Sequence, residues 1–158
     1  MIITERLSVA PFTEAHGQVF FDLTCDRGFR SHPITDYRQA SVASACVWIV
    51  HNPHKLGVWE KSSGELIGMG GLSPWQWECE NLIDVTYRLR ESAWGKGYGS
   101  ELARALIEYG QKNLQAPLTA TITPDTLGPK KIAEKLGMTY EKRIILLGVQ
   151  TDLYRLQR

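Results

Sequence analysis

A glycine-rich turn between two apolar runs constrains this chain of 158 residues more than any other feature. The turn alternates glycine with other residues, in the order Trp94, Gly95, Lys96, Gly97, Tyr98, Gly99. Residues 82–89 before it predict a strand, and residues 100–109 after it place Leu102, Leu106 and Tyr109 on one buried helix face. Glycine allows close backbone approach, and the first N–H groups of a helix lack partners within it. The order therefore favours a phosphate or pyrophosphate site, although a tight connection without a ligand would need the same small residues.

Two common phosphate-binding motifs do not fit this turn. A Walker A loop requires Gly-Lys followed by Ser or Thr, whereas Lys96 is followed by Gly97. A dinucleotide fingerprint requires its third glycine one residue later and an acidic residue about 20 positions further on. Residues 119–121 contain no carboxylate, so both motifs are excluded.

The segment Tyr87–Leu102 resembles the acetyl-CoA signature of the GNAT superfamily of N-acetyltransferases, Gln/Arg-x-x-Gly-x-Gly/Ala. Its W-G-K-G-Y form is similar to the branch that acetylates ribosomal-protein N-termini (alanine or serine), with Trp94 in place of the usual Gln or Arg. Residues 4–12, 57–72 and 132–138 extend the resemblance over nearly the whole chain. It implies an α+β fold in a single domain, 1–158. The fold would be a central, mostly antiparallel twisted sheet of about seven strands with a splayed central pair, flanked by about four helices.

The resemblance implies acetyl-CoA as co-substrate and no metal. Pantetheine would run along the strand before the turn, and the pyrophosphate would bind main-chain amides of Gly95–Ser100. The residues expected to bind the cofactor are Tyr87, Arg88, Leu89, Trp94, Gly95, Lys96, Gly97, Tyr98, Gly99, Ser100 and Thr126.

Periodicity and turn residues predict the other elements. The predicted strands are Ile2–Ala10, 56–61, 65–72, 117–122, 140–147 and 148–156. The predicted helices are one from Thr13 to Leu23 with Val19, Phe20 and Leu23 inward, one over 36–51, and one over 123–138 ended by Gly137. The predicted irregular segments are 25–35 and 74–81.

Acetyl transfer from a thioester to a protein α-amine requires that the amine lose a proton, for which a modest general base or a water chain is enough. Asp84 stands where relatives often carry Glu, and Glu80 and Glu78 lie just before it, so Asp84 and Glu80 are the expected catalytic carboxylates. A solvated Asp84, or one paired with an arginine, is the alternative. In the family's second motif a serine or a tyrosine is a candidate proton donor to the thiolate. Pro129 and Ala133 occupy those positions here, so neither donor is present.

The acceptor side of the resembled fold suggests contacts from Phe29, Arg30, His32 and Tyr37, unless these form a solvated connector. Trp75 and Trp77 either shape a substrate mouth or cap the core. The expected acceptor is a protein N-terminal α-amine. A small amine (amino acid, polyamine or aminoglycoside) is the first alternative, and an acyl-CoA-binding regulatory module with little or no turnover is the second.

Composition limits the partners. A net charge of +1 gives no general attraction to nucleic acid or an anionic membrane, and no apolar run reaches the roughly 18 residues of a membrane span. Three cysteines without C-x-x-C spacing argue against a zinc site or a disulfide framework, so a cytoplasmic location is expected. A homodimer is kept as an option for the assembly.

Overall fold

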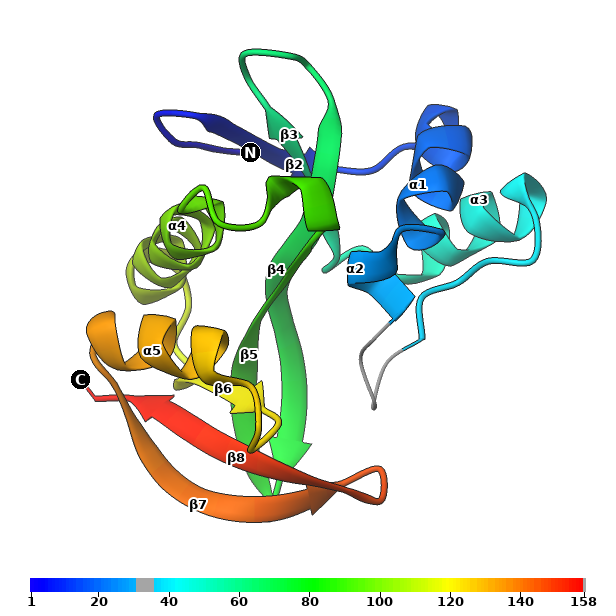
Figure 1. The fold of residues 1–158 in the computed structure, drawn as a ribbon. Coiled ribbons are helices and arrows are strands. Elements are labelled where there is room, and N and C mark those ends of the chain that lie inside the picture. Colours follow the sequence, from blue (N-terminus) through cyan, green and yellow to red (C-terminus); the bar gives the residue numbers. More distant parts are fainter. Residues whose placement is uncertain (31–35, 158) are drawn as a thin grey trace.

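A computed structural model describes residues 1–30 and 36–157 (Figure 1). The strands are β1 (Ile2–Ile3), β2 (Leu7–Pro11), β3 (Leu56–Glu60), β4 (Leu66–Trp77), β5 (Glu80–Leu89), β6 (Leu118–Ile122), β7 (Met138–Leu146) and β8 (Val149–Leu156). The helices are α1 (Gly17–Thr24), α2 (Arg27–Arg30), α3 (Val42–His51), α4 (Tyr98–Asn113) and α5 (Leu127–Lys135), with 3-10 turns η1 (Glu14–His16) and η2 (Glu91–Ala93).

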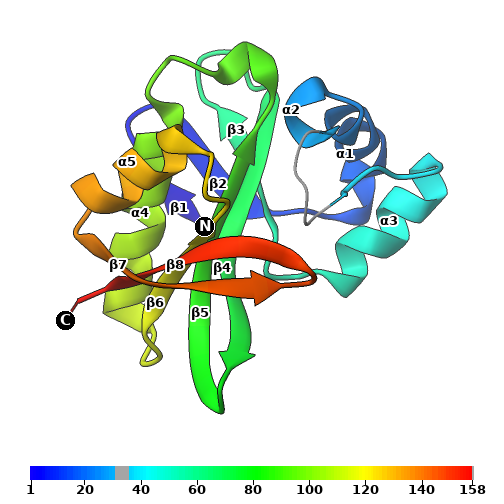
Figure 2. The ribbon, with the colours of Figure 1, turned by 60° about the horizontal axis from the view of Figure 1, so that its bottom comes forward.

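The strands form one sheet in the order β1-β2-β3-β4-β5-β6-β8-β7. Only β5 and β6 run parallel, so the predicted mostly antiparallel sheet is confirmed, with eight strands and five α-helices among the described residues. Helices α4 and α5 lie on one side of the long β4–β5 ribbon, and α1, α2 and α3 lie on the other (Figures 1 and 2). No helix of the described chain is long and apolar enough to cross a membrane.

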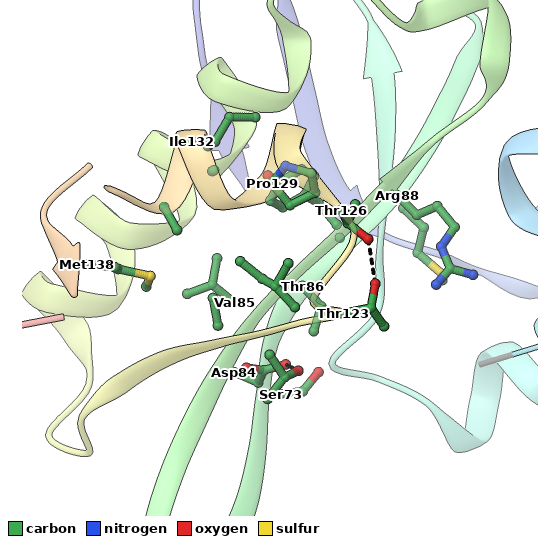
Figure 3. A pocket seen from close by; sticks show the side chains of 18 of the residues that line it. Ser73, Asp84, Val85, Thr86, Arg88, Thr123, Thr126, Pro129, Ile132 and Met138 are labelled. Atoms are coloured by element: carbon green, nitrogen blue, oxygen red, sulfur yellow. Dashed lines mark hydrogen bonds between the residues drawn. The ribbon is translucent and has the colours of Figure 1, made fainter. Parts of the chain in front are cut away.

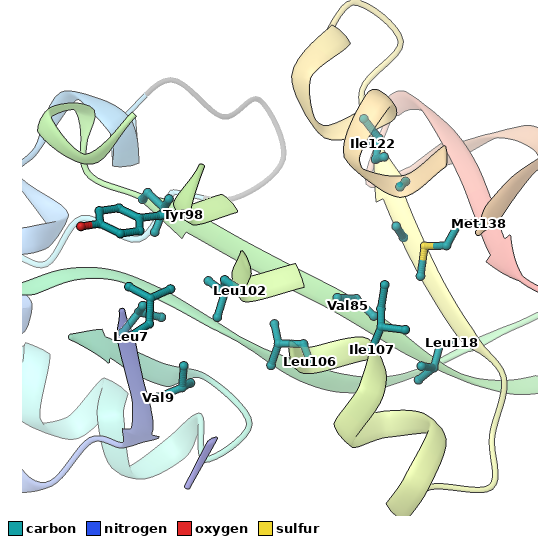
Figure 4. Close-up of a cluster of buried hydrophobic side chains, with 14 of the residues drawn as sticks. Leu7, Val9, Val85, Tyr98, Leu102, Leu106, Ile107, Leu118, Ile122 and Met138 are labelled. Carbon is teal, nitrogen blue, oxygen red and sulfur yellow. The ribbon is translucent and has the colours of Figure 1, made fainter. Parts of the chain in front are cut away.

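The main core lies between the sheet and α4 (Figure 4). Leu102 and Leu106 are buried as predicted, but Tyr109 is 45% exposed and that part of the prediction is wrong. The buried face runs instead through Ile107 and Gly110, because Gly110 has no side chain and Leu118 packs in the space a Cβ would take. A second cluster joins α1, α2 and α3 to β4; it consists of Phe20, Leu23, Phe29, Ala45, Ile49, Leu66 and Met69.

Several predicted boundaries are wrong in the first part of the chain. The opening strand is a hairpin, because Thr4 hydrogen-bonds to Leu7 in both directions and turns the chain between β1 and β2. The first helix buries Phe20 and Leu23 but leaves Val19 43% exposed. The irregular segment 25–35 contains α2. The helix predicted from residue 36 begins at Val42, where a Ser41–Ser44 capping box supplies its start.

The loop predicted over 74–81 is the end of a long hairpin. Strands β4 and β5 pair up to Trp77↔Glu80, leaving Glu78 and Cys79 as the turn. Both turn residues have positive φ, 48° and 65°, the geometry whose twist matches the flanking strands in two-residue hairpins. Such turns usually contain Asn-Gly or Asp-Gly, so Glu-Cys gave no signal for one. The predicted closing hairpin is confirmed as β7 and β8. Helix α5 is shorter than predicted, beginning after Thr126 and ending just before Leu136 and Gly137.

Candidate active site

The site lies where the two parallel strands separate. Strands β5 and β6 pair only at Ile83↔Leu118 and Asp84↔Thr119, after which β5 continues to Leu89 and β6 to Ile122. Two cavities, of about 590 Å³ and 450 Å³, adjoin this gap. They share six lining residues, Tyr87, Arg88, Thr123, Thr126, Pro129 and Ile132, and so form one continuous cleft.

The larger cavity contains the glycine-rich turn. All predicted cofactor-binding residues except Lys96 line it. Gly95 and Gly97 have φ of 73° and 80°, so both use the left-handed conformation that favours glycine. Gly97 is the N-cap of α4, and the first amides of that helix therefore begin at the cavity wall. These amides are suited to bind an anion such as a diphosphate.

Contacts from β1 and β2 hold the turn in place. The Glu101 carboxylate, in the first turn of α4, accepts hydrogen bonds from the Thr4 hydroxyl (2.6 Å), the Arg6 main-chain N–H (2.9 Å) and Arg6 Nε (2.7 Å). Arg6 Nη1 donates to the Lys96 carbonyl at 2.8 Å. The Lys96 main chain thus supports the turn from outside, which is why this residue alone of the predicted set does not line the cavity.

Gly99 lines the larger cavity together with Ile132 of α5 and Tyr87 of β5. A Cβ at Gly99 would lie 3.5 Å from both Ile132 Cδ1 and Tyr87 Cε2, at ordinary van der Waals contact. Trp94 Nε1 donates to the Leu89 carbonyl at 3.0 Å and keeps the exposed indole against the cavity. The described residues contain no cluster of His, Cys, Asp or Glu able to hold a metal ion.

Asp84 is buried at the point where β5 and β6 part (Figure 3). Thr121 Oγ1 donates to its carboxylate at 2.9 Å, and Thr119 Oγ1 lies 3.3 Å from the other oxygen. Trp75 Nε1 donates to Thr119 Oγ1 at 3.1 Å, which fixes that hydroxyl. Burial raises the pKa of Asp84 to about 6, against the lowering effect of the threonines and Lys55. The alternative of a solvated or arginine-paired Asp84 is therefore wrong, and the carboxyl is suited to accept a proton near neutral pH.

The other predicted carboxylates lie away from the cleft. Glu80, at the start of β5, receives Arg155 Nη1 at 2.7 Å and Nη2 at 2.9 Å, and these hydrogen bonds hold its pKa below the usual value. Glu78 pairs with Lys142 at 2.9 Å. Neither residue lines either of these two cavities, so the structure does not bring Glu80 together with Asp84.

The predicted acceptor-side residues separate into different environments. Tyr37 lines the smaller cavity, whereas Phe29 is fully buried and Arg30 is exposed outside both cavities. His32 lies outside the described residues. Trp75 lines the smaller cavity and Trp77 does not, although their ring centroids are 6.1 Å apart.

Several cavity residues were not predicted. Lys55 comes from the segment before β3, and its Nζ donates to Thr86 Oγ1 at 3.0 Å. Thr123 shares a hydroxyl–hydroxyl hydrogen bond with Thr126, a residue that was predicted, where the cavities meet beside Pro129 (Figure 3). The alternation of β5 could have indicated Thr86, which faces the same side as Asp84. Nothing local could have indicated Lys55, because only the packing of β3 against β4 brings it close.

Comparison with known proteins gives concordant results. A sequence model described as an acetyltransferase (GNAT) domain matches residues 6–139. The uncharacterized protein YkkB of Bacillus subtilis (strain 168) is 36% identical over 86 residues, 54% of this chain and 50% of the relative. The chain thus spans about half the length of the curated relative it matches.

Two solved structures share the fold over nearly their whole length. A GNAT-family acetyltransferase from Bordetella pertussis has a TM-score of 0.81 at 17% identity, covering 99% of both chains. The ribosomal L7/L12 alpha-N-protein acetyltransferase RimL, solved in complex with coenzyme A, has a TM-score of 0.80 at 16% identity, covering 97% of this chain and 94% of the other.

Proposed function

Since the chain belongs to the GNAT family of acetyltransferases, we propose that it transfers an acetyl group from acetyl-CoA to a primary amine, the α-amine of a protein N-terminus. The observation that carries this proposal is the buried Asp84 carboxylate, held where β5 and β6 part and lining a cavity continuous with the glycine-rich turn.

In the proposed complex, the diphosphate of acetyl-CoA lies on the first amides of α4, and pantetheine lies along Tyr87–Leu89. Beyond Asp84 no described strand pairs with β5 on the β6 side, so its main-chain groups there are available to an extended amide-bearing ligand, except the Leu89 carbonyl, which accepts from Trp94 Nε1. The thioester then points toward the smaller cavity, where the amine enters. Positioning of the two reactants supplies most of the acceleration.

Asp84 accepts the amine proton, directly or through one water, as the amine nitrogen forms its bond to the thioester carbonyl carbon. The C–S bond then breaks and coenzyme A leaves as a thiolate. Pro129 and Ala133 have no proton to give it, whereas the hydroxyls of Thr123 and Thr126 lie at the junction of the cavities. We propose that these hydroxyls face the leaving thiolate.

The pKa of the base favours an α-amine over a lysine side chain. An α-amine has a pKa of about 8 and lysine one of about 10.4. Proton transfer from the amine to a carboxylate whose pKa is about 6 is therefore less uphill for the α-amine than for lysine, by roughly two pKa units. A small amine is the second candidate, because the smaller cavity of about 450 Å³ is within the range of small-molecule sites. A regulatory acyl-CoA-binding module is the third, motivated by Pro129 and Ala133.

An acceptor panel tests the proposal. Purified protein with acetyl-CoA is offered N-terminal peptides, free amino acids, polyamines and aminoglycosides, with thiol release followed in parallel with the mass of each acceptor. We expect steady release together with a mass increase of one acetyl group on peptide α-amines. Transfer to small amines alone would select the second candidate, and coenzyme A binding without transfer to any acceptor would select the regulatory module.

A further inference from the structure

The face of β5 that carries Asp84 also carries positive charge. Asp84, Thr86 and Arg88 alternate along the strand and therefore lie on one side of the sheet. The Lys55 ammonium lies over the middle of this row, with Nζ 3.0 Å from Thr86 Oγ1. The Arg88 guanidinium lies at its end, 4.8 Å from the centroid of the Tyr37 ring. All of these residues line the smaller cavity.

The charges of the cavity lining do not balance. Lys55 and Arg88 are cationic and Asp84 is the one acidic residue among the described lining residues. The lining is therefore positive when Asp84 is ionised and more positive when it is protonated. A polycationic acceptor would place its further ammonium groups against Lys55 and Arg88, which like-charge repulsion disfavours in a partly enclosed site.

We propose that the acceptor carries a carboxylate beside its amine, and that Lys55 binds this carboxylate while Asp84 faces the amine. This inference rests on the proposed function and specifies its substrate class. Asp84 and Thr86 are two residues apart on an extended strand, which corresponds to roughly 7 Å. That spacing suits a peptide with Asp or Glu as one of its first two residues better than the adjacent amine and carboxylate of a free amino acid.

A contact between the Lys55 ammonium and the carboxylate of the acceptor would give Lys55 a function on this face of the sheet. A hydrogen bond to a charged group is stronger than one between neutral groups, and an ammonium bound to a threonine hydroxyl still has two protons to donate. The competing explanation is that Lys55 only stabilises the ionised form of Asp84. The two explanations predict different kinetics, because tuning of Asp84 would affect every acceptor equally.

The test uses three peptides that differ only in their second residue, which is Glu, Gln or Lys. With native protein we expect the KM of the Glu peptide to be about tenfold below that of the Lys peptide, the effect of one hydrogen bond to a charged group. Lys55→Met should raise the KM of the Glu peptide about tenfold and change that of the Gln peptide less than about twofold, and Lys55→Arg should restore the preference. Lys112→Met, at an exposed position of α4 outside both cavities, is the matched control.

A loss of kcat shared equally by all three peptides in Lys55→Met, or a preference for the Lys peptide in native protein, would overturn the inference. Binding of the N-acetylated peptides to the coenzyme A-loaded protein, measured by calorimetry, gives a readout that does not depend on turnover. Absence of transfer would count against the proposed function. Equal affinity for acetylated Glu and Lys peptides would count against this inference, and tighter binding of N-acetylglutamate than of the Glu peptide would assign the site to free amino acids.

Discussion

Asp84 is held in a state that opposes folding. Its pKa of about 6 lies above the 3.8 of an exposed aspartate because burial disfavours the charged form. The folded protein therefore binds the proton more tightly than the unfolded chain between these pH values. Because of this difference, the free energy of unfolding falls as the pH rises from about 4 to about 6, by an amount on the order of 3 kcal/mol. Strained electrostatics of this kind gather at functional sites.

The pH dependence of acetyl transfer should identify Asp84 as the base. If the reaction needs both an ionised Asp84 and a neutral α-amine, log kcat/KM for a peptide should rise with slope about 2 below pH 6 and about 1 from there to pH 8. Asp84→Asn should lower kcat/KM by about 10² or more and leave a slope of about 1 throughout.

Glu80→Gln is the matched control, since Glu80 is bound by Arg155 outside both cavities. It should keep the native profile. An Asp84→Asn enzyme with an unchanged low-pH limb would show that the proton goes elsewhere.

For single residues of the site, the sequence indicated those in or near the glycine-rich motif but not those that only tertiary packing brings close. Asp84 was predicted because its place before the glycine-rich turn matches the family pattern. Glu80 was predicted on proximity alone, yet Arg155 on β8 binds it at the sheet surface. Lys55 was missed because its contact with Thr86 depends on a strand that is distant in the sequence.

At the level of the elements, the turn before α4 positions the main-chain amides that bind the diphosphate of acetyl-CoA in the proposed complex. Its geometry depends on Gly97, whose φ of 80° places the first amides of α4 at the cavity. Arg6 secures both ends of the turn, through the Lys96 carbonyl and Glu101. Hydrogen bonds from a separate hairpin thus fix the direction in which the helix begins.

Replacing two left-handed glycines separates backbone strain from ligand binding. Gly97→Val and Gly64→Val each force a β-branched residue to positive φ and should each cost about 1–2 kcal/mol of stability. Gly64 lies in the β3–β4 turn, where a Cβ would meet no described atom within 4 Å. Gly97→Val should also weaken coenzyme A binding about tenfold or more, because the amides must move with the strained turn.

Calorimetric titration of both variants with coenzyme A measures whether Gly97→Val weakens binding more than Gly64→Val does. Equal affinities in the two would mean that the turn is only a tight connection between strand and helix.

Element types were more predictable than element ends. The strand, turn and helix around residues 82–109 stand out because hydrophobic period and glycine placement agree there. The β4–β5 hairpin was missed because its turn uses Glu78 and Cys79, which take positive φ under the constraint of two long paired strands. Ser41 caps α3 well, but the polar residues before it also suit a helix, so the start was placed too early.

At the scale of the whole molecule, the sheet consists of two parts joined by a short contact. Strands β1 to β5 form one antiparallel run and β6, β8 and β7 form another, with two residue pairs between β5 and β6. The hydrophobic core beneath α4 spans both parts, with Val85 from one and Leu118 and Ile122 from the other (Figure 4). The core holds the sheet together where main-chain pairing stops.

Binding of coenzyme A between β5 and β6 should therefore stabilise the protein measurably. Coenzyme A at about 100 times its Kd should stabilise the protein by about 2.7 kcal/mol, which corresponds to a rise in Tm of roughly 5–11 °C. Amide hydrogen exchange should slow chiefly in residues 85–89 and in the first turn of α4. Gly97→Val at the same concentration should show a smaller rise. Protection confined to β1, β2 and β3 would place the ligand elsewhere.

The interrupted ladder between β5 and β6 has a consequence for the reaction cycle under the proposed function. A carrier whose arm contains two amide bonds would lie in the gap as a temporary strand. The protein would complete its sheet on loading and reopen it on release of the spent carrier. Each turnover would then require the main-chain hydrogen bonds of this added strand to form and to break.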